Sequence, residues 1–244
     1  MIPWVHLDST TLPDGGELKL ARRGDEFSIR LGGNELMNSR LSGSEEALAT
    51  LACAKLSGRP APRVLIGGLG MGFTLRAALP LLPADAQVVV AELLPAVVDW
   101  ARGSMAPLFG ACLDDPRVRV EVQDVARLMG SGAGAASLPW DAILLDVDNG
   151  PDGLTQAAND GLYGAAGLAV ARRALGAGGV FAVWSEKPDD AFAKRFARAG
   201  FAVEDHRVHA HCGRSGRRHV VWVGVQSQTV FSGGLTKNLS SQKT

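Results

Sequence analysis

Short apolar runs alternate with segments of helical pattern between residues 63 and 185. The apolar runs cover 64–67, 88–92, 118–122, 142–146 and 180–184, and the helical segments include 73–82, 95–104 and 162–175. Continuous apolar strands that alternate with helices form a parallel sheet with helices on both faces, so we expect an α/β fold. After another helical segment at 191–199, apolar runs at 202–207 and 219–225 are typical of an antiparallel ending to such a sheet.

The two ends of the chain have different patterns. Residues 17–21 and 27–31 alternate apolar and polar side chains around a turn at 23–25, which predicts a small N-terminal β-hairpin region over 1–43. A helix should follow, with Ser44 as its N-cap and two glutamates in its first turn. The main domain then covers 44–225. Residues 226–244 are rich in Ser, Thr, Gln and Lys, and we expect a disordered tail there.

Charge and cysteine content exclude several classes of protein. Lys plus Arg and Asp plus Glu both number 25 in 244 residues, so the formal charge is zero and we expect no nucleic-acid partner. No apolar stretch has membrane-spanning length and no signal-peptide pattern is present, which predicts a cytoplasmic protein without a membrane partner. The three cysteines lie far apart without C-x-x-C spacing, so we expect reduced thiols and no metal site.

A glycine-rich turn follows the first apolar run, with glycines at Gly68, Gly70 and Gly72 before a helical segment. Glycine tolerates positive φ and lets the backbone approach a ligand closely. The free N–H groups at a helix N-terminus bind polar or anionic groups. The pattern is therefore typical of a nucleotide-like ligand, although a tight turn in any α/β sheet would look the same.

Two acids follow the next two apolar runs. Glu92 ends the second run, where a carboxylate can accept hydrogen bonds from a ribose diol. Asp124 follows the third run, where it can accept from an adenine amino group while Val125 supports the ring. Glu92 could instead be a solvated or helix-capping residue, and Asp124 could be the N-cap of a helix, alone or in addition to binding.

The fourth apolar run delivers Asp146 to the edge of the sheet where ligands bind in open α/β folds. Asp148 and Asn149 follow in a polar loop. Acids grouped beside a site of low dielectric constant suit recognition of a cationic or amine substrate. The alternative for Asp148 and Asn149 is a purely structural Asx-turn.

Together these motifs resemble the spermidine synthase family (polyamine aminopropyltransferases), over residues 17–225. The resemblance implies a Rossmann-like seven-stranded methyltransferase fold and a homodimer paired through the N-terminal region. It also implies S-adenosylmethionine, or its decarboxylated form, as the cofactor. The three glycines would line its methionine part, Glu92 its ribose, and Asp124 with Val125 its adenine. Asp146 matches the family aspartate that orients the attacking amine and takes its proton.

The chain departs from the family pattern on the acceptor side. The family reads G-G-G-D-G-G at the glycine turn, and its acid, which helps to hold the aminopropyl ammonium, is replaced here by Gly70. The second acid of the family D-x-x-D pair falls on Asn149, with Asp148 adjacent. A family Tyr-His-Glu motif aligns with 44–46, which leaves Glu46 as the matching acid. We expect Glu46, Asp148, Asn149 and Tyr163, the only tyrosine, on the acceptor side.

The sequence therefore predicts a transferase that moves an aminopropyl or methyl group to a small-molecule amine or similar nucleophile. Loss of the family acid at Gly70 keeps methyl transfer open beside aminopropyl transfer. A non-catalytic nucleoside-binding module on the same fold is an alternative. An NAD-dependent dehydrogenase is another, but it would require a G-x-G-x-x-G turn and a Tyr-Lys pair, and Tyr163 has no lysine nearby.

Overall fold

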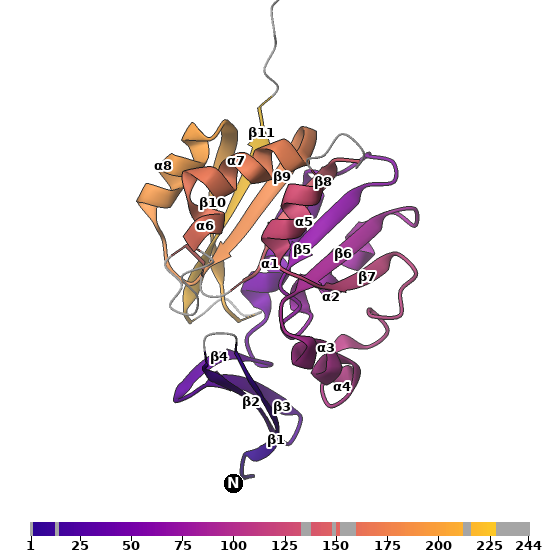
Figure 1. Cartoon of the computed structure of the whole chain (residues 1–244), viewed down its shortest axis with the longest axis vertical. Coiled ribbons are helices and arrows are strands. Elements are labelled where there is room, and N and C mark those ends of the chain that lie inside the picture. Colours follow the sequence, from indigo (N-terminus) through magenta and orange to yellow (C-terminus); the bar gives the residue numbers. More distant parts are fainter. Residues whose placement is uncertain are drawn as a thin grey trace, which may run out of the picture.

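The computed structural model describes residues 2–12, 15–132, 138–147, 150–151, 160–211 and 216–227. The described chain forms a seven-stranded sheet between two helical layers, with a separate four-stranded sheet at the N-terminus (Figure 1). Of the predicted tail, 228–244 lie outside the described residues, as do Asp148 and Asn149.

The seven-stranded sheet has the order β10-β11-β9-β8-β5-β6-β7. Its five parallel strands are β5 (Arg63–Gly67), β6 (Gln87–Glu92), β7 (Val118–Val122), β8 (Trp140–Leu145) and β9 (Leu175–Ser185). Strand β11 (Arg218–Gln226) lies antiparallel between β9 and β10 (Phe201–His209). The predicted α/β sheet and its antiparallel ending are confirmed.

Helices cover both faces of this sheet, and alternate strand residues point into the two resulting cores. In β5, for example, Val64 and Ile66 belong to one apolar cluster and Leu65 to the other. One layer contains α1 (Gly43–Ala54), α2 (Phe73–Ala78) and α3 (Pro95–Arg102). The other contains α5 (Val125–Gly132), α6 (Asp160–Tyr163), α7 (Ala165–Ala174) and α8 (Asp190–Arg198). A short 3₁₀ helix (Leu79–Leu81) and α4 (Ala106–Phe109) complete the described helices.

The N-terminal region is larger than the predicted hairpin. It is an antiparallel sheet of β1 (Val5–Thr11), β2 (Glu17–Arg23), β3 (Glu26–Leu31) and β4 (Asn34–Asn38). The two outer strands lack a buried apolar alternation, because β1 is almost wholly exposed and β4 has only two apolar residues. The inner strands bury side chains such as Leu20 and Ile29 in the same apolar cluster as α1.

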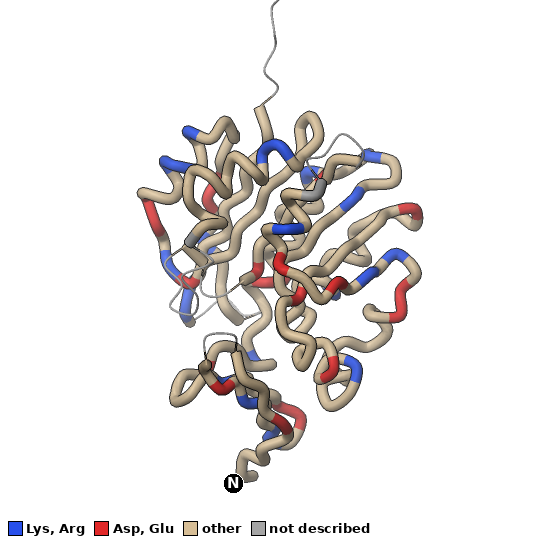
Figure 2. The backbone as a smooth tube through the Cα atoms, viewed as in Figure 1, with Lys and Arg blue, Asp and Glu red and all other residues tan. Residues whose placement is uncertain are grey.

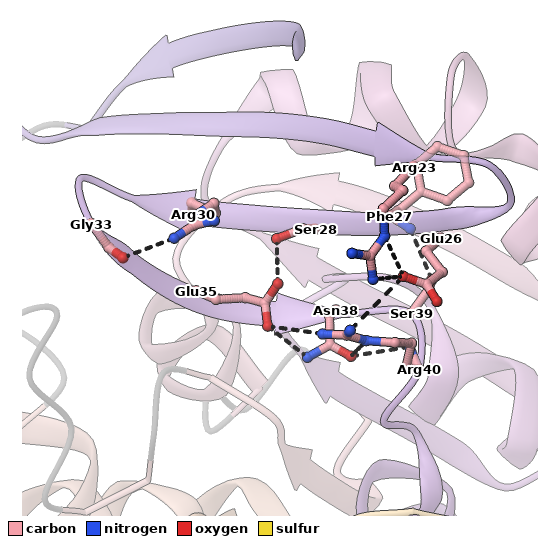
Figure 3. A network of polar contacts seen from close by, with 10 residues as sticks. All are labelled: Arg23, Glu26, Phe27, Ser28, Arg30, Gly33, Glu35, Asn38, Ser39 and Arg40. Atoms are coloured by element: carbon pink, nitrogen blue, oxygen red, sulfur yellow. Dashed lines mark hydrogen bonds and ion pairs between the residues drawn. The ribbon is translucent and has the colours of Figure 1, made fainter. Parts of the chain in front are cut away.

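A network of polar side chains ties β3 to β4 (Figure 3). The Glu35 carboxylate accepts hydrogen bonds from Ser28 Oγ at 2.6 Å and from Asn38 Nδ2 at 3.0 Å. Arg40 Nη2 lies 3.4 Å from the same carboxylate. Ser28 and Asn38 are both buried, so this network fixes the position of β4 on the sheet.

Two helix predictions need correction. Helix α1 begins at Gly43, so Ser44 lies inside the first turn and is not the N-cap; its hydroxyl is used for other contacts. The expected helix at 162–175 is two helices, because the chain bends at Gly164, which is extended (ψ 170°).

Charges of both signs are interspersed along the chain in the view of Figure 2, in keeping with the zero formal charge. Within the described ranges, no helix combines the length and apolarity that crossing a membrane would require.

Candidate active site

A pocket lies at the carboxyl edge of the parallel strands, between that edge and the N-terminal sheet. The N-terminal sheet and the turn after β1 supply an apolar wall of Leu12, Leu18, Ile29, Leu36 and Met37. The strand ends supply six residues that the sequence predicted, namely Gly68, Gly70, Glu92, Asp124, Val125 and Asp146. Because the carboxyl ends of parallel strands meet at one edge, residues up to 78 positions apart in the chain share one pocket.

The glycine turn has three residues with positive φ, but they do not have the same surroundings. Gly68 (φ +89°) lies against the end of β8, where a Cβ would be 2.2 Å from the carbonyl oxygen of Asp146. Gly70 (φ +49°) faces Met37 of the apolar wall. Gly72 is the N-cap of α2, where a Cβ would be 2.3 Å from the Phe109 ring, and it is not among the pocket residues.

Glu92 connects the glycine turn to the end of β6. Its carboxylate oxygens accept hydrogen bonds from the backbone N–H of Leu69 and of Leu94, both at 3.0 Å. Burial raises the pKa of Glu92, against the lowering effect of these backbone donors. The backbone of Gly70 and of Leu93 also interacts with this carboxylate, so Glu92 is held firmly at the edge of the pocket that it lines.

Asp124 caps a helix, as one of its two predicted roles requires, and it also lines the pocket; binding of adenine stays a prediction. Its Oδ1 accepts from the backbone N–H of Ala126 at 2.8 Å, which caps the N-terminus of α5. Asp124 also lines the pocket, beside the buried Val125. The cap fixes the carboxylate at the pocket edge and leaves Oδ2 for a ligand.

Asp146 is partly buried and lies directly after β8. Its backbone N–H donates to the Gly67 carbonyl at 2.8 Å, and its Oδ2 accepts from Thr74 Oγ1 at 2.6 Å. Burial raises the pKa of Asp146 to about 6, although the Thr74 hydrogen bond lowers it. A carboxylate with such a pKa is ionised near neutral pH and is a stronger proton acceptor than an ordinary aspartate.

Glu45 is the acid that the sequence analysis missed. Burial, and after it the negative charge of Asp146, raise the pKa of Glu45 to about 7. Its Oε2 accepts from Ser44 Oγ at 2.6 Å, and Ser44 Oγ lies 2.9 Å from His219 Nδ1. The sequence offered two adjacent glutamates, and only the exact start of α1 decides which one faces inward.

The other acceptor-side predictions have different positions. Glu46 is not among the pocket residues, and one carboxylate oxygen lies 3.6 Å from Arg76 Nη2. Tyr163 is buried against Phe192, and its hydroxyl donates to the carbonyl of Val147, at 3.2 Å. Tyr163 therefore supports the backbone beside Asp146 from below the pocket. The roles of all these residues stay predictions.

The pocket has acidic side chains and backbone N–H donors beside them, and the described residues form no metal cluster. No group of three or more His, Cys, Asp or Glu in the described ranges is arranged to hold a metal ion. The pocket thus combines a carboxylate that caps α5, a carboxylate held by backbone donors and a carboxylate of raised pKa, and the last is suited to accept a proton.

Comparisons with known proteins show similarity to one class of transferase. No family model matches the chain. Polyamine aminopropyltransferases of Mycobacterium tuberculosis and Mycobacterium bovis are 31% identical to it over 200 residues, which are 79% of this chain. The match covers 36% of each relative, so the chain spans about a third of their length.

Solved structures show the same fold. A spermidine synthase in complex with the transition-state analogue AdoDATO has a TM-score of 0.70 at 17% identity, covering 91% of this chain and 72% of that one. A spermidine synthase from Thermotoga maritima has a TM-score of 0.69 at 18% identity, with the same coverage. The chain is similar to polyamine aminopropyltransferases in sequence and to spermidine synthases in fold. In this spermidine synthase-like chain, the pocket occupies the carboxyl edge of the sheet that these structures share.

Proposed function

We propose that the chain is an aminopropyltransferase that uses decarboxylated S-adenosylmethionine and a small-molecule amine, in the polyamine class. The observation that carries the proposal is the convergence of Glu92, Asp124 and Asp146 on one pocket. The relatives are named for this activity, and the chain matches them over most of its own length.

The described residues fit an adenosyl sulfonium. Gly68 and Gly70 have positive φ and both line the pocket, so the backbone of the glycine turn can contact a ligand there. Glu92 would hold the ribose diol, and Asp124 with Val125 would hold the adenine. When bound, the donor supplies a carbon attached to a sulfonium, whose leaving group is a neutral thioether.

Asp146 would act on the acceptor. The amine nitrogen forms a bond to the donor carbon while the C–S bond breaks and its electron pair stays on sulfur. The nitrogen loses one proton, which the Asp146 carboxylate takes. Thr74 Oγ1 holds Oδ2 at 2.6 Å, so the carboxylate has a fixed orientation toward the pocket. The apolar wall excludes water from the reacting groups.

Methyl transfer from S-adenosylmethionine is the second candidate, because of one observation. Gly70 carries no side chain, and a Cβ there would lie 3.1 Å from Met37 Cε. An apolar thioether therefore stands beside this position, where the family has an acid for an ammonium group. Without that acid, no carboxylate at this position would repel the carboxylate of S-adenosylmethionine, a group that the decarboxylated donor lacks.

Turnover with each donor separately tests the proposal. Each donor is incubated with a panel of amines, and methylthioadenosine and S-adenosylhomocysteine are quantified. We expect methylthioadenosine with decarboxylated S-adenosylmethionine. If only S-adenosylhomocysteine forms, the chain is a methyltransferase. If neither product forms, the proposal of a transferase is contradicted. We expect Asp146→Asn to keep donor affinity and to lower turnover by more than about tenfold.

A further inference from the structure

The first turn of α1 contains a chain of polar contacts that links Glu45 to His219 through Ser44. Ser44 has no exposed surface, and its Oγ lies 2.6 Å from Glu45 Oε2 and 2.9 Å from His219 Nδ1. His219 is 6% exposed and packs edge-on against Trp184, with ring centroids 5.0 Å apart. These contacts join α1 to β11 and β9 and fix the position of the Glu45 carboxylate.

Thr74 contacts both the Asp146 carboxylate and the backbone of Glu45. The Thr74 hydroxyl donates to Asp146 Oδ2 at 2.6 Å, and its oxygen lies 3.4 Å from the backbone carbonyl oxygen of Glu45. The charge of Asp146 contributes to the raised pKa of Glu45, which indicates that the two carboxyl groups interact electrostatically.

Neither carboxylate has a cationic partner in the part of the chain that the structure describes. The ion pairs within 4.0 Å there involve other acids. Asp146 receives a hydrogen bond from the Thr74 hydroxyl, and Glu45 receives hydrogen bonds from the Ser44 hydroxyl and from its own backbone N–H. Two ionised acids that are partly buried without a cation repel each other, and this repulsion costs free energy. A positive charge bound between them would replace the repulsion by two attractions.

We propose that Glu45 is a second acceptor-binding residue, which holds the ammonium group of the acceptor together with Asp146. This inference rests on the proposed function and names the chemistry that its acceptor must have. An ammonium group has three N–H donors, so it can bind both carboxylates at once through charge-assisted hydrogen bonds.

Ser44 acts as a positioning residue for Glu45. Its only hydroxyl proton goes to Glu45 Oε2, so its oxygen accepts a hydrogen bond from His219 Nδ1–H. This assigns the tautomer of His219 and leaves the lone pair on Nε2, which has no hydrogen-bond partner among the described residues. The arrangement holds Glu45 in one orientation without neutralising it.

Steady-state kinetics of Glu45→Gln test the inference, with decarboxylated S-adenosylmethionine as donor and 1,4-diaminobutane as acceptor. We expect the KM for 1,4-diaminobutane to rise at least about tenfold, the effect of losing one charge-assisted contact. The Kd for the donor should stay within about twofold, because Glu45 lies outside the donor pocket. Ser44→Ala should raise the same KM by a smaller factor.

Glu204→Gln is the matched control. Glu204 is an exposed acid on β10 that pairs with Lys55, one residue beyond the end of α1, at 2.8 Å. This variant removes one negative charge near the same helix, and its kinetic constants should match the wild type. If Glu45→Gln does not fold, Glu45→Asp and Ser44→Ala decide the question, and an unchanged KM in both would overturn the inference.

The outcomes separate this inference from the proposed function. If the wild type converts donor and acceptor and Glu45→Gln has the KM of the control, the proposed acceptor-binding role of Glu45 is wrong, while the proposed transferase activity stands. If the wild type does not bind the donor, the proposed function fails, and the inference falls with it.

Discussion

At the scale of single residues, Gly68 is the position where backbone geometry permits the least change. Its φ of +89° is a conformation that residues with a side chain rarely adopt. A Cβ there would also lie 2.2 Å from the carbonyl oxygen of Asp146, which is backbone and cannot rotate away. The close approach of β5 and β8 at the pocket therefore depends on this glycine.

We expect Gly68→Ala to lower the free energy of unfolding by at least about 3 kcal/mol, measured by denaturant titration, since backbone strain and a steric clash add. Gly33→Ala is the control, because a Cβ there meets nothing within 4 Å and its φ is not positive. Equal stability of the two variants would show that β5 and β8 do not approach each other as described.

Asp146 should also make stability depend on pH. Its pKa in the folded state, about 6, lies above the ordinary value of 3.8, so ionisation costs folding free energy. That cost is absent below the unfolded pKa and reaches its full size once the pH passes the folded pKa.

Asp146→Asn should therefore be more stable than the wild type by about 3 kcal/mol near pH 8, and most of the difference should be lost by pH 4. Thermal unfolding across this pH range measures it. Asp25→Asn, at a fully exposed side chain, should show no such trend. A constant difference at all pH values would mean that the charge of Asp146 is not the cause.

At the scale of elements, the N-terminal sheet is a part of the pocket as well as an attachment to the domain. Strand β4 places Leu36 and Met37 in the apolar wall, and Glu35, next to them, holds β4 to β3 (Figure 3). Ser28 and Asn38 are buried, so without Glu35 they would lose their hydrogen-bond acceptor.

We expect Glu35→Ala to speed hydrogen exchange in β3 and β4, with a loss of about 1–2 kcal/mol in local stability, and to weaken donor binding. Glu17→Ala is the control, because Glu17 pairs with Lys19 at the surface. Unchanged donor affinity in Glu35→Ala, with exchange accelerated, would show that the apolar wall does not contribute to binding.

The same elements show what the sequence could predict. The five parallel strands were predictable because apolar runs bounded by glycines and charges leave little choice of structure. Strands β1 and β4 were not, because β1 is exposed and β4 is held by the Glu35 network rather than by an apolar pattern. Glu45 was missed because the family motif aligns its acid with Glu46, and because α1 begins at Gly43 and not after an N-cap at Ser44.

At the scale of the whole molecule, the central claim is that separate strand ends form one site for an adenosyl sulfonium. Glu92, Asp124 and Asp146 were predictable as a group, because the carboxyl ends of parallel strands share an edge. The apolar wall was not, because it requires the N-terminal sheet to fold over that edge, and this contact leaves no local pattern in the sequence.

Hydrogen exchange of the wild type with and without decarboxylated S-adenosylmethionine tests this claim most directly. We expect the donor to slow exchange in three segments at once: the glycine turn at Leu69, the residues after β6 at Leu94 and the start of α5 at Ala126. The first two amides donate to the Glu92 carboxylate and the third donates to that of Asp124. Amides of α7 and α8, outside the pocket, should not change. Saturating donor that leaves the three segments unprotected, or protects α7 and α8 instead, would contradict the account.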